Sequence, residues 1–322
     1  MERLRTALGA REALLAGGQT NVARLFNSAV DGIDGLVIEK LGEALIVQLH
    51  EGRLRLSEDA LRELCTRAAE KVGARAVYRK VFPRDRTQPQ QVLDELHHDA
   101  EPWLGETLPE EFAVREDGVS FLVHPYDGYA TGLFLDHRVT RAGVRKLAAG
   151  RRVLNGFAYT CGFTVAAALG GAASTVSVDV SRKYLEWGKR NLAVNGVDLE
   201  PHRFICSDIF DYYRRAERQG HRFDLLILDP PTFARMKKPR RTFALSEDLG
   251  RLVAEGLALL EPRGHVYLSA NHRGTSLGQL ERAMEDGARA NGRSCEIVER
   301  GLVGEDFAGD PEQGKCVLAR VS

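Results

Sequence analysis

Long apolar runs are missing from the sequence, and no stretch approaches the roughly 20 apolar residues that a membrane-spanning helix requires. Residues 1–18 carry charges throughout and lack the apolar centre of a secretory signal, so we expect a cytoplasmic protein without membrane contact. Cysteines are few, odd in number and never arranged as a CxxC pair. This pattern argues against a disulfide framework and against a structural metal site, and we expect no bound metal.

Net charge is also lacking, because 45 Lys and Arg balance 45 Asp and Glu. The chain therefore has no overall basic field, and any contact with nucleic acid must come from a local patch. What the chain does have is length: 322 residues, of which 43% are hydrophobic, are enough for two domains, each with its own core. The sequence leaves the oligomeric state open, and a homodimer is compatible with it.

Residues 1–110 predict a small α+β domain, because helical spacing alternates with short apolar strands. Residues 111–138 follow as a linker, in which Asp117-Gly118 predicts a tight β-hairpin that joins the domains. The irregular segment 82–102 contains no predicted element. The expected helices cover 4–16 and 57–72, and the expected strands cover 36–41, 44–49, 76–79, 112–115 and 119–123.

Residues 139–322 change to a regular alternation of strand and helix, which predicts an α/β domain with a parallel, Rossmann-like sheet covered by helices on both faces. In such sheets the ligand lies at the carboxyl ends of the strands, near the point where the strand order reverses. Segments 294–299 and 315–321 are expected to add an antiparallel edge hairpin. The expected parallel strands are 153–155, 175–179, 203–206, 225–229 and 266–269, and the expected helices are 163–169, 182–194, 208–218 and 246–260.

The first of these strands runs into a loop of small residues, 155–163, whose backbone could approach a ligand. The loop is not a GxGxxG motif, so a dinucleotide dehydrogenase is disfavoured. Asp179 ends the second strand, where a carboxylate can accept hydrogen bonds from ribose hydroxyls, and Asp208 follows the third, where it could bind an adenine amino group. Either acid alone is also a typical helix N-cap. Together they predict a nucleoside cofactor.

The fourth strand ends in Asp229-Pro230-Pro231-Thr232-Phe233. Two prolines hold the backbone extended, so the Asp229 side chain and the nearby carbonyls are expected to face the mouth of the crevice. These acceptors suit a planar base that carries amino or ring N–H donors, and Phe233 could stack on that base. An ordinary loop with a core aromatic is the alternative.

Six segments together resemble the bacterial large-subunit ribosomal RNA methyltransferase family: FLDHR (134–138), VLNGFAYTCGF (153–163), SVDVS (177–181), YLEWGKRNLAVNG (184–196), LDPPTF (228–233) and YLSANHRG (267–274). Segment 31–49 is similar to the domain that precedes the catalytic domain in that family, and 131–138 is similar to its linker. One branch of the family makes 5-methylcytosine, and the other is the 7-methylguanine-forming half of a fused enzyme. The N-terminal PUA RNA-binding domain of the cytosine branch is not found in this sequence.

The resemblance implies a class I methyltransferase sheet that uses S-adenosylmethionine (SAM) and acts on 23S ribosomal RNA. It implies that Asp179 holds the ribose, Asp208 the adenine, and that Asp229 lies beside the transferred methyl group. Arg138 is a candidate partner for the cofactor carboxylate. The further residues implied in cofactor binding are, on the methionine side, Asn155, Phe157, Tyr159 and Gly162, and, closing over the cofactor, Thr131 and Asp136.

The sequence departs from the family at two places. Cys161 replaces a loop glycine, and we interpret it as a tolerated small residue beside the cofactor. The fifth strand ends in Ser269-Ala270-Asn271, where the cytosine branch has a cysteine. Methylation of cytosine C5 needs a thiolate that adds to the base, whereas guanine N7 already presents a lone pair. We therefore expect methylation at guanine N7, with Asp229, Pro230, Pro231 and Phe233 as the catalytic segment.

A basic run follows this segment, with five basic residues in the seven positions 235–241. A solvated loop is the ordinary interpretation, but phosphate-binding charge between Phe233 and Phe243 is typical of sites for unpaired RNA. The candidate RNA-binding residues are Arg235, Lys237, Lys238, Arg240, Arg241 and Arg273. The open alternatives are a cytosine-C5 enzyme, a methyltransferase of the same fold that acts on protein or a small molecule, and a non-catalytic RNA-binding protein.

Overall fold

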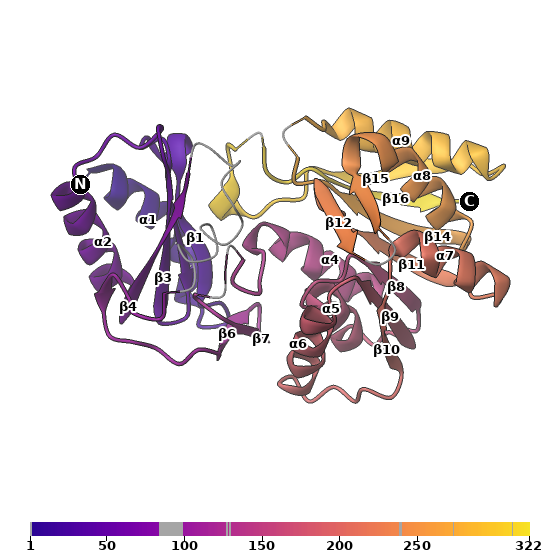
Figure 1. Cartoon of the computed structure of the whole chain (residues 1–322), viewed down its shortest axis with the longest axis horizontal. Helices are drawn as coiled ribbons and strands as arrows, with labels where there is room; N and C mark the ends of the chain where they lie inside the picture. The colour runs from indigo at the N-terminus through magenta and orange to yellow at the C-terminus, as the bar shows by residue number, and fades with distance from the viewer. Residues whose placement is uncertain are drawn as a thin grey trace. The chain divides into compact units, whose positions relative to one another are not determined.

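The computed structural model describes residues 2–83, 99–126, 128, 130–237, 240–272, 274–310 and 312–322. The chain divides into two compact units (Figure 1). The N-terminal unit comprises Met1–Leu135 together with Glu305–Asp310, and the C-terminal unit comprises Asp136–Gly304 together with Pro311–Ser322. The predicted hairpin around Asp117 and Gly118 belongs to the N-terminal unit.

The N-terminal unit is built on a five-stranded sheet in the order β1-β2-β3-β4-β5, in which only the β3–β4 pair is parallel. A second, two-stranded sheet pairs β6 with β7, and both turn residues, Asp117 and Gly118, have the positive φ that the sequence predicts. The strands are β1 (Val22–Asn27), β2 (Leu36–Leu41), β3 (Ala44–His50), β4 (Ala76–Phe82), β5 (Leu104–Gly105), β6 (Phe112–Glu116) and β7 (Val119–Val123).

Helices α1 (Glu2–Ala16) and α2 (Glu58–Val72) pack their apolar side chains against the strands of this sheet. The predicted start of α2 is confirmed, because the hydroxyl of Ser57 caps the helix by accepting a hydrogen bond from the N–H of Ala60. Strands β1 and β5 were not predicted, and β4 extends beyond the predicted 76–79 to Phe82.

A segment from the far end of the chain completes the N-terminal unit. The carboxylate of Asp306 accepts a hydrogen bond of 3.0 Å from the N–H of Arg24, and the guanidinium of Arg24 lies over the ring of Phe307 at 4.3 Å. Asp306 is buried, with 1% of its surface exposed. Because the hydrogen bond joins residues 282 positions apart, local sequence patterns could not predict it.

The C-terminal unit contains a seven-stranded sheet in the order β10-β9-β8-β11-β14-β16-β15. Five strands are parallel, and β16 and β15 add the predicted antiparallel edge pair. The strand order reverses between β8 and β11, which is where ligands bind in this class of fold. The strands are β8 (Arg152–Gly156), β9 (Ser174–Asp179), β10 (His202–Cys206), β11 (Phe223–Leu228), β14 (Leu260–Ser269), β15 (Cys295–Arg300) and β16 (Cys316–Val321).

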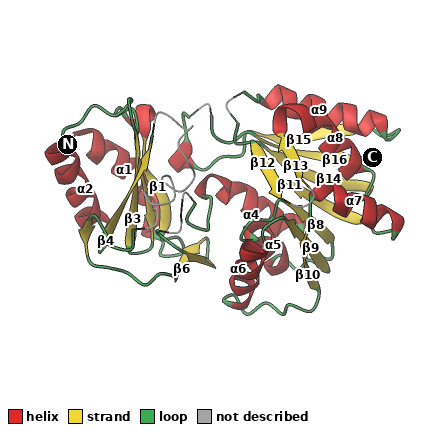
Figure 2. Cartoon of the chain, in the orientation of Figure 1, coloured by secondary structure: helices red, strands yellow, loops and turns green. Residues whose placement is uncertain are grey.

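Helices cover this sheet on both faces, so the predicted α/β architecture is confirmed (Figure 2). Alternate residues of β11 explain the arrangement: Leu225 and Ile227 pack with α4 and α5, whereas Leu226 and Leu228 pack with α7, α8 and α9. Among the described residues, no helix is long and apolar enough to cross a bilayer. The helices are α4 (Arg138–Leu147), α5 (Gly162–Leu169), α6 (Arg182–Ala193), α7 (Ile209–Arg218), α8 (Leu245–Leu257) and α9 (Leu277–Ala290).

Four described elements of the C-terminal unit were not predicted. They are α4, α9 and an antiparallel pair formed by β12 (Phe233–Lys237) and β13 (Arg240–Ala244). A solvated loop was the ordinary interpretation of the basic run, but its described residues belong to these two strands.

Candidate cofactor and acceptor site

The register of the parallel strands brings the predicted site residues to one edge of the sheet. Gly156 at the end of β8 is paired with Val178 of β9 on one side and with Leu228 of β11 on the other. The next residue of each strand therefore lies at the same level, so Phe157, Asp179 and Asp229 occupy neighbouring positions at the carboxyl edge. This is the edge, beside the reversal of strand order, where the sequence predicts the ligand.

The loop between β8 and α5 has an unusual backbone. Phe157, Tyr159 and Cys161 have φ values of 59°, 48° and 62°, a region that residues other than glycine rarely adopt. Each such residue costs about 1 kcal/mol or more, so the surrounding structure must hold the loop in place. The N–H of Cys161 donates to the carbonyl of Ala158 at 2.7 Å, which closes the turn.

Helix α6 supports this loop. The side-chain amide of Asn191 donates to the carbonyl of Thr160 at 2.9 Å, and a Cβ atom on Gly188 would overlap the sulfur of Cys161. Cys161 is fully buried in this contact, and burial raises the pKa of its thiol to about 12. Its side chain packs into the protein and supports the loop, and its position beside the cofactor stays a prediction.

Asp179 connects the loop to β9. One oxygen of its carboxylate accepts the N–H of Tyr159 at 2.9 Å, and the other accepts the N–H of Ser181 at 2.8 Å. Burial raises the pKa of Asp179, although these backbone hydrogen bonds oppose the shift. The N–H of Val180 also donates to this carboxylate, so three backbone donors leave one lone pair for a ligand hydroxyl. Beside it, Val180 exposes half of its surface, an apolar face suited to a planar adenine.

Asn155 lies beneath the loop rather than on its surface, with 1% of its surface exposed. Its amide donates to the hydroxyl of Thr164 at 3.0 Å, and this hydroxyl is 2.7 Å from that of Ser177. The carbonyl oxygen Oδ1 of Asn155 has no hydrogen-bond partner among the described residues. An unsatisfied buried acceptor at this place fits a site that is completed by a bound group.

Asp208 is a helix N-cap, which was the alternative interpretation of this residue. Its side chain caps α7 by accepting hydrogen bonds from the N–H groups of Phe210 at 3.0 Å and Asp211 at 3.1 Å. A contact between this carboxylate and an adenine stays a prediction.

Asp229 is held by two side chains that lie in the quoted motifs but to which the sequence assigned no role. The hydroxyl of Ser269 donates to its Oδ1 at 2.6 Å, and Nε2 of His137 forms an ion pair with its Oδ2 at 3.2 Å. Burial favours the neutral form of Asp229, but the charge and hydrogen bond of His137, with the hydrogen bond of Ser269, outweigh it and lower the pKa. Burial likewise lowers the pKa of His137, but Asp229 and Asp136 outweigh it and raise the pKa to about 9.

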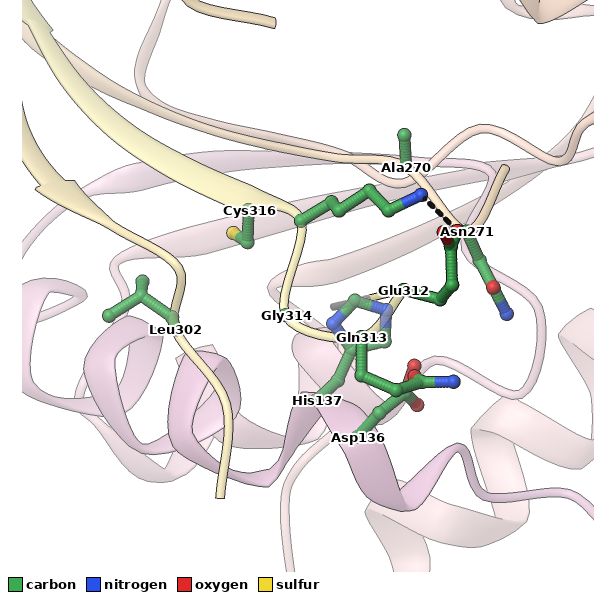
Figure 3. A pocket seen from close by; sticks show the side chains of 10 residues that line it. Asp136, His137, Ala270, Asn271, Leu302, Glu312, Gln313, Gly314 and Cys316 are labelled. Atoms are coloured by element: carbon green, nitrogen blue, oxygen red, sulfur yellow. Dashed lines mark hydrogen bonds and ion pairs between the residues drawn. The ribbon is translucent and has the colours of Figure 1, made fainter. Parts of the chain in front are cut away.

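A pocket adjoins His137 at the carboxyl end of β14 (Figure 3). His137 and Asp136, from the segment that begins α4, form one wall, and Asn271 and Gln313 contribute side-chain amides. Lys315 also lines the pocket, and its ammonium group donates to Glu312 at 2.8 Å and to the carbonyl of His272 at 2.7 Å. The pocket thus offers both donors and acceptors directly beside the Asp229 ion pair.

The remaining predicted cofactor residues are placed as follows. Gly162 is the first residue of α5, and Arg138 is the first residue of α4, where it is buried with 7% exposure. Tyr159 packs edge-on against Tyr184 of α6, with ring centroids 4.5 Å apart. Thr131 belongs to the N-terminal unit, where its carbonyl accepts the N–H of His124.

In the catalytic segment, Pro230 is buried and Pro231 is exposed, and Phe233 begins β12 with half of its surface exposed. Phe243 was expected to flank the basic run as an RNA-facing aromatic, but it is buried and its ring lies 5.2 Å from that of Phe157.

The basic run is described only by its backbone. Arg235 and Lys237 lie on β12, and Arg240 and Arg241 lie on β13, with Lys237 paired to Arg240. Lys238 and Arg273 lie outside the described residues. The described residues contain no group of three or more His, Cys, Asp or Glu that could hold a metal ion.

Comparison with known proteins places this geometry in a family. Residues 34–318 match the family model described as S-adenosylmethionine-dependent methyltransferase. Ribosomal RNA large subunit methyltransferase K of Neisseria meningitidis serogroup B is 44% identical over 171 residues, which are 53% of this chain and 48% of that protein. A ribosomal RNA large subunit methyltransferase of Deinococcus radiodurans is 32% identical over 296 residues, which are 90% of this chain and 70% of that protein.

The chain thus spans about half the length of the Neisseria relative, and it covers 26% of the ribosomal RNA large subunit methyltransferase K/L of Methylococcus capsulatus. Among solved structures, a protein assigned as a methyltransferase and complexed with SAH superposes with a TM-score of 0.85 and 27% identity, over 99% of this chain and 80% of that chain. The family match covers most of the sequence, and the loop after β8 and the carboxylate of Asp179 lie at the sheet edge where such folds bind their ligand. The chain belongs to the S-adenosylmethionine-dependent methyltransferase family.

Proposed function

We propose that this protein transfers a methyl group from SAM to a base of large-subunit ribosomal RNA, and that the acceptor atom is guanine N7. The names of the relatives in Neisseria and Deinococcus support the RNA class. The ion pair between His137 and Asp229 is the observation that supports the choice of atom.

The ion pair leaves the acceptor side without a free base at neutral pH. Because the pKa of Asp229 is lowered, its carboxylate takes up a proton reluctantly. Because the pKa of His137 is raised to about 9, its imidazole is already protonated near pH 7. An amino nitrogen must lose a proton when it is methylated, whereas guanine N7 has none to lose. The pair therefore favours an acceptor that reacts through an existing lone pair.

The chain's residues contribute position and charge to this reaction. Asp179, the strained loop and Val180 would hold the cofactor, whose sulfonium supplies an electrophilic methyl group. The lone pair of N7 forms the new C–N bond while the methyl–sulfur bond breaks and leaves its electron pair on sulfur, so no proton moves. Positive charge passes to the base, and the free lone pairs of Asp229 would stabilise it there.

Partition of a methyl label tests this proposal. Purified protein is incubated with methyl-labelled SAM and, in separate reactions, with ribosomal RNA, with cell protein or with a small-molecule extract. We expect the label in RNA alone, and we expect Asp229→Ala to lose incorporation while it still binds SAH. Label in protein or in small molecules, with none in RNA, would overturn the proposed substrate class.

A further inference from the structure

We propose that His137 is a positioning residue, which together with Ser269 fixes the carboxylate of Asp229 toward the methyl acceptor. This inference rests on the function proposed above, because it assigns how the acceptor-side carboxylate of that reaction is held. His137 itself is not required to touch the base.

The geometry of the carboxylate carries the inference. Ser269 occupies one lone pair of Oδ1 at 2.6 Å, and His137 occupies one of Oδ2 at 3.2 Å. Both partners come from rigid elements, since Ser269 ends β14 and His137 immediately precedes α4. A carboxylate with one fixed donor on each oxygen cannot rotate about its Cβ–Cγ bond without breaking both interactions. Its remaining lone pairs are therefore held in fixed directions.

His137 is itself fixed by the cofactor side of the site. Its ring packs edge-on against Phe163, with centroids 5.3 Å apart and planes at 64°. Phe163 belongs to the first turn of α5, directly after the strained loop. A single imidazole thus contacts both the helix that follows the cofactor loop and the carboxylate on the acceptor side. We infer that it keeps these two parts of the site at a constant separation.

The charges that face the imidazole keep it protonated. Asp229 faces it from the end of β11 and Asp136 from its own segment, and both favour the cation, whereas Arg141 of α4 opposes it. Lys315 lines the same pocket just before β16, but its ammonium is paired with Glu312 at 2.8 Å. The two carboxylates outweigh the guanidinium of Arg141, so the net field stabilises the imidazolium.

The sign of the pH effect follows from these shifts. The pKa of His137 is raised from 6.5 to about 9, so its contribution to stability is complete below pH 6.5 and is lost as the pH rises through about 9. The pKa of Asp229 is lowered, so its contribution is present above pH 3.8 and is lost as the pH falls through its folded value. The intact pair therefore covers the whole neutral range, and its alkaline limit is set by His137.

The experiment combines a titration that needs no substrate with a rate measurement. The protein is labelled at histidine Cε1 for NMR. The signal of His137 is assigned as the one that is missing in His137→Gln. Its pKa is then measured in wild type and in Asp229→Asn. We expect about 9 in wild type and a value below the ordinary one in Asp229→Asn. Methyl transfer is then measured against pH for wild type, His137→Gln and His137→Ala at saturating SAM and RNA.

We expect His137→Ala to lose about 100-fold in kcat, because a misplaced group in a reacting site costs this much. His137→Gln keeps a donor without a charge, so it should retain more activity than His137→Ala and lack the decline near pH 9. Both variants should keep wild-type affinity for SAH in calorimetry. His265→Gln is the matched control, because His265 lies within β14 and its ring nitrogen is 2.9 Å from the guanidinium of Arg151, and it should keep the wild-type rate.

A wild-type His137 that titrates at its ordinary value, or a His137→Ala variant with the wild-type rate and pH profile, would overturn the inference. Failure of the proposed function has a different signature. Wild-type protein would then methylate no RNA, while the NMR titration would still decide whether the ion pair exists.

Discussion

Ser269 and Cys316 lie directly opposite each other in the antiparallel pair of β14 and β16. The sequence shows no cysteine at the end of the fourth or fifth strand, yet this register brings one to the neighbouring position. Cys316 is nevertheless buried, with 1% exposure, in the core cluster that also contains residues of α4 and α5. Burial raises the pKa of its thiol to about 12, so it is not a thiolate at neutral pH.

Replacement of Cys316 by alanine tests whether this thiol takes part in the chemistry. We expect Cys316→Ala to keep the wild-type rate of methyl transfer, because a buried, protonated thiol cannot add to a base. The free energy of unfolding should fall by about 1 kcal/mol, as is usual for a core truncation. Rates are measured by label incorporation, and stability by urea denaturation. A loss of activity of about 1000-fold or more, the size expected for a missing nucleophile, would contradict the account.

Asp179 provides the second prediction, because it joins the loop to the proposed ribose site. Asp179→Asn replaces one acceptor oxygen by a donor, which then faces the N–H of Tyr159 or of Ser181. Loss of a hydrogen bond to a charged group costs about 1.5–3 kcal/mol, so we expect SAH affinity to fall by roughly 10- to 100-fold in calorimetry.

The pH dependence of SAH binding offers an independent check on Asp179. Its pKa is raised, so protonation of the carboxylate should begin to weaken SAH binding at a higher pH than for an ordinary aspartate. The Asp179→Asn variant should lack this acidic decline. Identical acid profiles for the two proteins would argue against contact between Asp179 and the cofactor.

The contact between Gly188 and Cys161 gives the third prediction. Gly188→Ala places a methyl group against the sulfur of Cys161 and should displace the strained loop, which lowers both stability and SAH affinity. Cys161→Gly removes the sulfur and suits the positive φ of this position. In the double variant the two changes compensate, so we expect stability and affinity above those of Gly188→Ala alone.

A double-mutant cycle in thermal unfolding and calorimetry measures this compensation. Strictly additive effects of the two substitutions would show that the steric contact does not control the loop. Gly250→Ala is the matched control, because Gly250 lies within α8 and has open space around its Cβ position. Gly196→Ala is not suitable, because Gly196 has a positive φ.

The basic run at positions 235–241 provides the fourth prediction. We expect weaker binding of unpaired RNA when alanine replaces Lys237, Lys238, Arg240 and Arg241. The slope of log affinity against log salt concentration should become shallower by about 0.7 for each phosphate that is no longer neutralised. Filter binding at several salt concentrations measures this slope, and SAH affinity should not change. If the variant bound RNA at low salt with wild-type affinity, the proposed role of the basic run would be contradicted.

The parallel sheet and the positions of two candidate site carboxylates could be predicted from the sequence, because their signals are local. The apolar run Leu225–Leu228 is buried on both faces, and Asp179 and Asp229 lie at strand ends, so a short window contains the information. The same holds for the hairpin at Asp117 and Gly118, whose turn chemistry is a property of two residues.

The contacts that could not be predicted depend on tertiary structure. The pairing of His137 with Asp229 joins two segments that are distant in sequence, and the opposition of Ser269 and Cys316 depends on the register between two antiparallel strands. The place of Cys161 in the loop indicated a small residue, but the sequence did not show that its side chain lies against Gly188 of α6. Sequence position alone does not give the direction of a side chain.

The identity of the methylated nucleoside tests the central claim most directly. Ribosomal RNA methylated by the purified protein is digested to nucleosides and analysed by mass spectrometry, with Asp229→Ala as the control. The account predicts 7-methylguanosine in the wild-type reaction and its absence in the control. Formation of 5-methylcytidine would contradict the account, because that reaction needs a thiolate beside the base. Cys316, which lies opposite Ser269, is buried, and burial raises the pKa of its thiol.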